Sequence, residues 1–224
     1  MMTKISGECS KMRETEVVNM ICDVFSKADY TSLIKVSRSG VVYRSSYWEA
    51  VKIKGVKVPK PLVLPDFILV FKDYQEYIDE YLIVAVETKW FKGKGKNLDK
   101  RLRKAYREFG QPIRNYIFGF DSTLLLHLFH EDVGESRIIS YVDNIDSAIK
   151  LLDLPIVYMA TKLINNKFHI YSPVSIERLQ DTSYVINYIH NLCSSVRNPI
   201  LEKTDEKERV IERRKVLKTA LNLP

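Results

Sequence analysis

The sequence predicts an α/β domain in which helices flank a central mixed β-sheet. Three features predict this class: a helical apolar repeat at 13–29, two apolar runs of strand length at 61–71 and 81–90, and further strand and helix patterns after residue 155. With 224 residues, of which 46% are hydrophobic, the chain is long enough to bury one good-sized core. We therefore expect one domain over residues 1–198 and, at 199–224, a charged helix that docks on it or mediates dimerisation.

The first helix is expected from Arg13 to Asp29, because apolar residues recur there at three- and four-residue spacing. At about 100° per residue, Glu14 lies on the same face as these apolar side chains and points inward. Two interpretations of Glu14 stay open. It either complements the helix dipole from the first turn or serves a site beneath the helix.

Two strands with a turn between them are expected next. The strands run from Leu33 to Val36 and from Val41 to Trp48, and the turn contains Arg38-Ser39-Gly40. Several lysines then lie on a stretch punctuated by Pro and Gly, which indicates a basic loop or edge strand near a nucleic-acid backbone. They are Lys52, Lys54, Lys57 and Lys60.

The centre of the sequence is a predicted hairpin, PLVLPDFILVF and YLIVAVETKW, whose two apolar runs contain charges. Glu87 and Lys89 are two apart and point to the same face of a strand, and Asp66 opens the neighbouring strand. Buried charges cost several kcal/mol unless they are paired or bind a metal. Because carboxylate oxygens suit a hard divalent cation, the sequence predicts a Mg2+ or Mn2+ site at this sheet edge.

Pro65-Asp66, followed after the hairpin by Glu87-Thr88-Lys89, resembles the signature of the PD-(D/E)XK nuclease superfamily. Its members include restriction enzymes and archaeal Holliday-junction resolvases. Both halves of the signature lie on apolar strands in the required order. The resemblance covers roughly residues 10–118 and is closest to the archaeal resolvases and to the nuclease-like proteins of archaeal spindle-shaped viruses. It implies a restriction-endonuclease-like fold for the domain.

The resemblance also implies roles for single residues. Asp66, Glu87 and the backbone carbonyl of Thr88 would hold the metal, and Glu14 would reach it directly or through water. Lys89 would position the attacking water or stabilise charge on the phosphate. In archaeal resolvases an Arg and a Ser-Gly occupy a similar place before the PD strand, so Arg38 and Ser39 either contact the scissile phosphate or form an ordinary turn.

A basic helix is expected from Leu98 to Phe109, with Gly110 as its C-cap. Its cations outnumber its acids and follow the predicted metal strand directly, which favours a DNA-facing helix over a merely solvated one. Gln111 and Tyr116 are similar to a Gln and a Tyr of RecB-type members, but the spacing differs and no role follows. The residues expected to hold the DNA backbone are Lys92, Lys94, Lys96, Arg101 and Lys104.

The C-terminal half carries no signature of its own. His127 and His130 are three apart on a short apolar segment and lack a third ligand, so we expect them to be ordinary imidazoles. Helices are expected from Asp146 to Leu152, from Ser175 to about Cys193 and from Thr204 to Leu221. The strands expected here are 156–160 and 167–171, joined by a tight turn.

Composition limits the compartment and the partners. The net charge of +7 and the sequence pI of about 9.1 favour a polyanionic partner, nucleic acid first, although a mildly basic protein without such a partner shows the same balance. Three scattered cysteines indicate a reducing compartment. No apolar run approaches the roughly 20 residues that span a bilayer. We expect a soluble intracellular protein, in the host cytoplasm if viral.

The function expected from these features is a Mg2+- or Mn2+-dependent DNA endonuclease. A junction, a flap, a duplex end and a specific sequence all remain open as substrates. A junction cutter makes two symmetric incisions, so that substrate would require a twofold homodimer. Two alternatives remain: a catalytically inactive DNA-binding protein on the same fold, and a basic scaffold in which Glu87 and Lys89 form a structural salt bridge.

Overall fold

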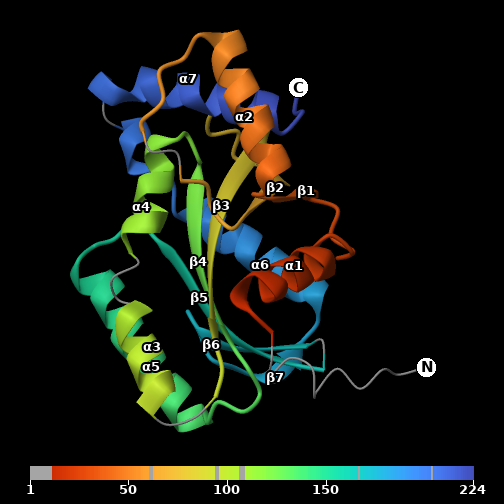
Figure 1. Cartoon of the computed structure of the whole chain (residues 1–224), viewed down its shortest axis with the longest axis vertical. Helices are drawn as coiled ribbons and strands as arrows, with labels where there is room; N and C mark the ends of the chain where they lie inside the picture. Colours follow the sequence, from red (N-terminus) through yellow and green to blue (C-terminus); the bar gives the residue numbers. More distant parts are fainter. Residues whose placement is uncertain (1–11, 61–62, 94–95, 106–108, 166, 203) are drawn as a thin grey trace.

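A mixed β-sheet forms the centre of the protein (Figure 1). The computed structural model describes residues 12–60, 63–93, 96–105, 109–165, 167–202 and 204–224. Neighbouring strands are parallel in the β3–β4 and β4–β5 pairs and antiparallel elsewhere. Within the described residues the seven strands lie side by side in chain order: β1 (Leu33–Arg38), β2 (Phe67–Lys72), β3 (Tyr81–Phe91), β4 (Ser122–Phe129), β5 (Val157–Ile164), β6 (Lys167–Ser172) and β7 (Ile176–Gln180).

Helices cover both faces of this sheet, which confirms the predicted α/β class. On one face α1 (Glu14–Phe25) and α6 (Thr182–Ser195) pack against alternate strand residues (Figure 1). The helices contribute apolar side chains at three- and four-residue spacing and the strands at two-residue spacing, as the two backbone geometries require. The central members of this cluster are Val17, Ile21 and Phe25 from α1, Ile186 and Ile189 from α6, and Phe67, Val84 and Leu126 from the sheet.

The opposite face carries two separate apolar clusters. The first lies under α2 (Val41–Lys54) and α7 (Thr204–Ala220) and contains Tyr43, Tyr47, Val216 and Leu217 over Ile68, Ile83 and Ala85. The second lies under α3 (Lys96–Ala105) and α5 (Glu135–Leu151) and contains Leu98, Leu102, Ile138 and Tyr141 over Phe91 and Leu125. Between α3 and β4 the chain forms the short helix α4 (Gly110–Ile117).

The expected strand from Val41 to Trp48 is wrong, because this segment belongs to α2. Its valine, tyrosine and tryptophan content is typical of strands. The residues that enter the core are Tyr43, Tyr47 and Ala50, at the spacing of one helix face. Lys52 and Lys54 therefore lie in the last turn of a helix that ends at Gly55 in the left-handed conformation.

Three expected helix ends are also wrong. Asp146 lies inside α5 and accepts a hydrogen bond from the Ser172 hydroxyl, so it does not begin a helix. Ser175 precedes a strand, β7, and the following helix begins after Asp181, whose carboxylate accepts the Tyr184 N–H at 2.8 Å. Gly110 begins α4 and so does not cap the basic helix.

The charged C-terminal helix α7 packs on the domain. Val210, Leu217 and Leu221 are buried, as their spacing predicts. Arg214 on the same helix is only 2% exposed and bonds Asp79 and Asp121, which lie at the start of β3 and of β4. The α7 backbone passes so close to Gly119 that a Cβ there would lie 2.5 Å from the Arg214 nitrogen. Gly119 also has a φ of +97°, so both space and conformation require glycine.

Candidate metal centre

Strand β3 extends past its neighbour β2. The pairing of the two strands ends at Phe67 and Val86, whereas β3 continues to Phe91 and pairs with β4 along that whole length. The edge of β3 that faces β2 is therefore open at residues 87–91. Backbone N–H groups on such an edge need other hydrogen-bond acceptors.

Two predicted carboxylates provide these acceptors. The N–H of Thr88 donates to Asp66 Oδ2 at 2.7 Å, and the N–H of Trp90 donates to Glu14 Oε2 at 3.3 Å. The other oxygen of Glu14 lies 3.5 Å from Lys89 Nζ. Because the N–H and C=O of one strand residue point to the same edge, the Thr88 carbonyl is directed to the edge where Asp66 lies. The structure thus brings these predicted site residues together.

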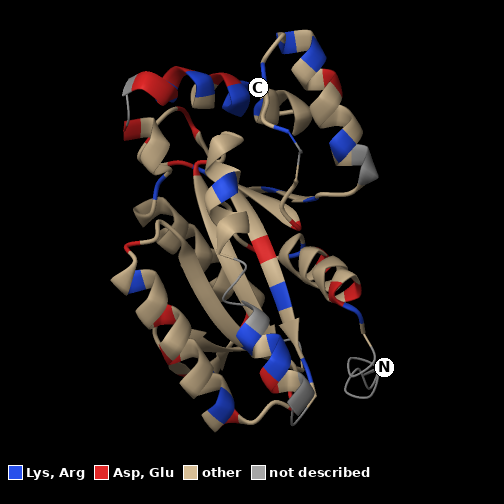
Figure 2. Cartoon of the chain, turned by 60° about the vertical axis from the view of Figure 1, so that its left-hand side comes forward, with Lys and Arg blue, Asp and Glu red and all other residues tan. Residues whose placement is uncertain are grey.

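Glu87 and Lys89 lie on the face of the sheet that carries the two apolar clusters. Ile83 and Ala85 precede them in the cluster under α2 and α7, and Phe91 follows them in the cluster under α3 and α5. The acidic and the basic band that Figure 2 shows on β3 fall between these helix layers. The two charged side chains therefore interrupt an otherwise apolar surface at one place.

The Glu87 carboxyl is 3% exposed, and its Oε1 accepts a hydrogen bond from Asn115 Nδ2 at 3.0 Å. Burial raises the pKa of Glu87 to about 7, and the negative charge of Asp66 raises it as well. The Asn115 hydrogen bond and the positive charges of Lys89 and Arg114 lower this pKa but do not outweigh burial. The positive groups nearby thus do not fully compensate the negative charge of the Glu87 carboxylate, and a bound cation would supply the missing positive charge.

Replacing Glu87 by glutamine is expected to stabilise the fold at pH 8 by about 2–3 kcal/mol in the absence of divalent cations. The folded-state pKa of about 7 exceeds the ordinary value of 4.5, so the parent loses stability as pH rises from 4.5 to 7. The gain in the variant should therefore be small at pH 4.5 and complete above pH 7. Urea unfolding at both pH values, with EDTA present, measures it.

The exposed Glu131 gives a matched control. Glu131→Gln should change the unfolding free energy by no more than about 0.5 kcal/mol at either pH. A Glu87→Gln variant that is less stable than the parent at pH 8 would show that the buried carboxylate is already compensated by the protein itself.

Sequence reasoning missed Asn115 and Arg114, the residues of α4 that act on Glu87. No local pattern identifies them, because their effect depends on how α4 lies against β3. The Tyr116 hydroxyl donates a hydrogen bond to the Pro155 carbonyl and makes no described hydrogen bond to Glu87. Pro112 lies in the first turn of α4, where a helix tolerates proline.

The predicted DNA-contacting residues that the structure describes make contacts within the protein. Arg38, at the end of β1, pairs with Asp23 and donates to the Asn19 carbonyl of α1. Lys92 Nζ donates to the Met12 carbonyl at 2.7 Å, and Arg101 donates to the Trp90 carbonyl on the open edge of β3.

Three further lysines and a serine complete the predicted set. Lys94 lies outside the described residues, and Lys96 and Lys104 belong to α3 with side chains that are not described. The Ser39 N–H donates to the Asp66 carbonyl at 3.2 Å. DNA contact stays a prediction for all these residues and for Arg38, Lys92 and Arg101.

The donor chemistry around Asp66 fits a hard divalent cation. Such ions keep several waters and take one or two carboxylates together with carbonyl oxygens, which Asp66, Glu87 and the Thr88 carbonyl offer. Within the described part of the chain, no cluster of three or more His, Cys, Asp or Glu side chains is arranged to hold a metal. The fit therefore rests on two carboxylates and a backbone oxygen.

His127 and His130 make contacts within the protein. His127 is fully buried between the hydroxyls of Tyr141 and Tyr158, and burial lowers its pKa to about 3, so it is neutral. His130 Nδ1 lies 2.7 Å from Asp132 Oδ1. Neither contact belongs to the open edge of β3.

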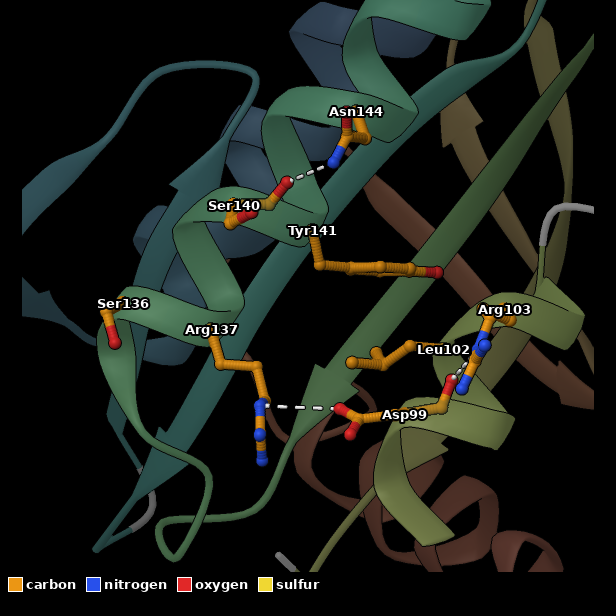
Figure 3. A pocket seen from close by; sticks show the side chains of 8 residues that line it. All are labelled: Asp99, Leu102, Arg103, Ser136, Arg137, Ser140, Tyr141 and Asn144. Atoms are coloured by element: carbon orange, nitrogen blue, oxygen red, sulfur yellow. Dashed lines mark hydrogen bonds and ion pairs between the residues drawn. The ribbon is translucent and has the colours of Figure 1, made fainter. Parts of the chain in front are cut away.

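A cavity of about 520 Å³ lies between α3 and α5 (Figure 3). Across it Arg137 Nε and Asp99 Oδ1 are 3.5 Å apart. The remaining lining residues are Leu102, Arg103, Ser136, Ser140, Tyr141 and Asn144. Asp99 is the sole carboxylate among these lining residues and is paired with Arg137, so the cavity offers a divalent cation less negative charge than Asp66 and Glu87 do.

Comparison of the chain with protein-family models, with curated proteins and with solved structures found no match. The class of protein that the fold defines is α/β, with a seven-stranded mixed sheet between helices in the described residues. Every helix within those residues is too short or too polar to cross a membrane.

Proposed function

We propose that the chain is a Mg2+- or Mn2+-dependent endonuclease that hydrolyses phosphodiester bonds in DNA. One observation carries the proposal: Asp66 accepts the Thr88 N–H at the open edge of β3, and its negative charge acts on the buried Glu87 carboxylate, which is short of positive charge. The PD and ExK sequence resemblance supports it, and so does the element order, in which two helices and two strands precede the Glu87 strand and helices follow it.

The residues have distinct roles in this proposal. Asp66, Glu87 and the Thr88 carbonyl would hold the cation, and Glu14 would contact it directly or through water. When bound, the cation would polarise the phosphodiester and lower the pKa of a bound water. Lys89 is held by Glu14 and is 18% exposed, so its ammonium can orient the attacking water or stabilise charge on the phosphate oxygens.

Cleavage of a labelled four-way junction and of a matched linear duplex tests this function. Mg2+ or Mn2+ should produce cuts that EDTA abolishes. Glu87→Gln should lose the cuts although it is expected to be at least as stable as the parent, so loss of folding cannot explain the result. Glu131→Gln, which makes the same change at an exposed position, should cut like the parent.

The other outcomes decide between the alternatives. Salt-sensitive binding of DNA without metal-dependent cutting would favour a DNA-binding protein on this fold. Absence of both binding and cutting for the two substrates would refute the nucleic-acid function. Symmetric cuts confined to the junction would add the homodimer to the proposal.

A further inference from the structure

Arg114 on α4 has two guanidinium nitrogens that lack hydrogen-bond acceptors among the described residues. Its Nε and Nη2 are enclosed from solvent and have no hydrogen-bond partner among the residues that the structure describes, although the side chain as a whole is partly exposed. Enclosed donors without acceptors are rare, and each costs free energy in a folded protein. The arrangement therefore indicates a missing acceptor at this position.

Glu87 Oε1 does not serve as the acceptor that Arg114 lacks. The charge of Arg114 acts on Glu87, so the two groups are near one another. Nevertheless, Glu87 Oε1 accepts its hydrogen bond from Asn115, the next residue of α4. Arg114 thus places positive charge beside the carboxylates while its enclosed donors remain available.

Other enclosed polar atoms belong to residues that bond Asp66 or Glu87. Asn115 Oδ1, Thr88 Oγ1 and Ser39 Oγ have no partner in the described part of the chain. Each belongs to a residue that bonds Asp66 or Glu87 through another of its atoms. Residues that bond Asp66 or Glu87 therefore carry polar atoms without hydrogen-bond partners, as expected where a polar ligand binds.

We propose that Arg114 binds a phosphate of the DNA backbone beside the Asp66–Glu87 pair. The proposal rests on the proposed function and adds the residue that holds the substrate phosphate. A guanidinium presents parallel N–H groups that match two oxygens of a phosphate, and its charge offsets that of the anion next to two carboxylates. A neutral ligand would carry no negative charge for the guanidinium to offset.

DNA affinity measured as a function of salt, with EDTA present and the full chain, tests the proposal without requiring cleavage. Arg114→Gln should weaken junction binding about tenfold and reduce the slope of log K against log salt by about 0.9, the value for one phosphate contact. Arg178→Gln is the matched control, because it removes the same charge at a distant place. Arg178 is exposed on β7, which lies four strands away from β3. It should keep the parent slope.

Thermal unfolding of Arg114→Gln separates binding from folding. The variant should melt close to the parent temperature, because it removes donors that have no acceptor together with a positive charge near Glu87. A variant that melts well below the parent would overturn the proposal by showing a structural role, as would an unchanged slope or a parent that does not bind DNA. A reduced slope in a protein that never cuts DNA would support the phosphate contact while the proposed catalysis fails.

Discussion

Replacing Asp66 by asparagine is expected to lower kcat for metal-dependent DNA cleavage about 10³-fold or more, equivalent to about 4 kcal/mol of transition-state stabilisation. The asparagine oxygen can still accept the Thr88 N–H, so the open edge of β3 should keep its geometry. What is lost is the negative charge that holds the cation. Cleavage rates at saturating DNA measure the effect.

Asp29→Asn is the control for this substitution, because Asp29 is exposed in the turn after α1. It should cut DNA at the parent rate. DNA affinity in EDTA should be at least as high in Asp66→Asn as in the parent, since the variant removes a negative charge from a surface that binds a polyanion. Cleavage by Asp66→Asn at near-parental rates would rule out Asp66 as a metal ligand.

Replacing Arg214 by methionine is expected to destabilise the fold by about 3–5 kcal/mol. Arg214 donates to Asp79, to Asp121 and to the Tyr81 carbonyl, and Asp121 is only 2% exposed. Burial raises the pKa of Asp121, and the guanidinium lowers it. Without Arg214 the buried carboxyl of Asp121 loses its cation. The midpoint of urea unfolding should fall accordingly.

Two further variants test whether the loss comes from the buried charge of Asp121. Arg209→Met on the same helix removes an exposed ion pair with Glu206 and should cost no more than about 0.5 kcal/mol. Adding Asp121→Asn to Arg214→Met should recover part of the loss, because the buried charge is then gone. An Arg214→Met variant as stable as the parent would contradict the importance of this ion network.

The candidate site could be predicted because its charges occupy positions where the strand pattern requires apolar residues. Asp66, Glu87 and Lys89 stand out against the valines, leucines and isoleucines around them. The inward direction of Glu14 followed from helical spacing, and its contact with Lys89 agrees with that direction. Local periodicity was sufficient for these residues.

The strand expected at 41–48 is wrong, because a partly alternating pattern over so few residues also fits one face of a helix. Tyr43, Tyr47 and Ala50 follow a helical period, and packing against β2 and β3 selects the helix. The expected helix at 146–152 covers only the end of α5, which begins at Glu135. Its buried residues Ile138, Tyr141, Val142, Ile145 and Ile149 also recur at helical spacing.

Contacts between distant segments could not be predicted from the sequence. Asp79 and Asp121, the ion-pair partners of Arg214, lie just before β3 and β4, far away along the chain, so nothing in the sequence of α7 distinguishes Arg214 from the other charges of this helix. Likewise, nothing local to α4 shows that Asn115 bonds Glu87. Such pairs depend on how the sheet brings its strands together, which periodicity does not specify.

Titration of Mn2+ into the DNA-free protein, followed by calorimetry, tests most directly whether Asp66 and Glu87 form a metal site. The parent should bind Mn2+ at pH 8 and more weakly at pH 6, because Glu87, with a pKa of about 7, must release its proton. Asp66→Asn and Glu87→Gln should each weaken binding by at least about tenfold. A parent that binds no Mn2+, or variants that bind it as tightly as the parent, would contradict the proposed metal centre.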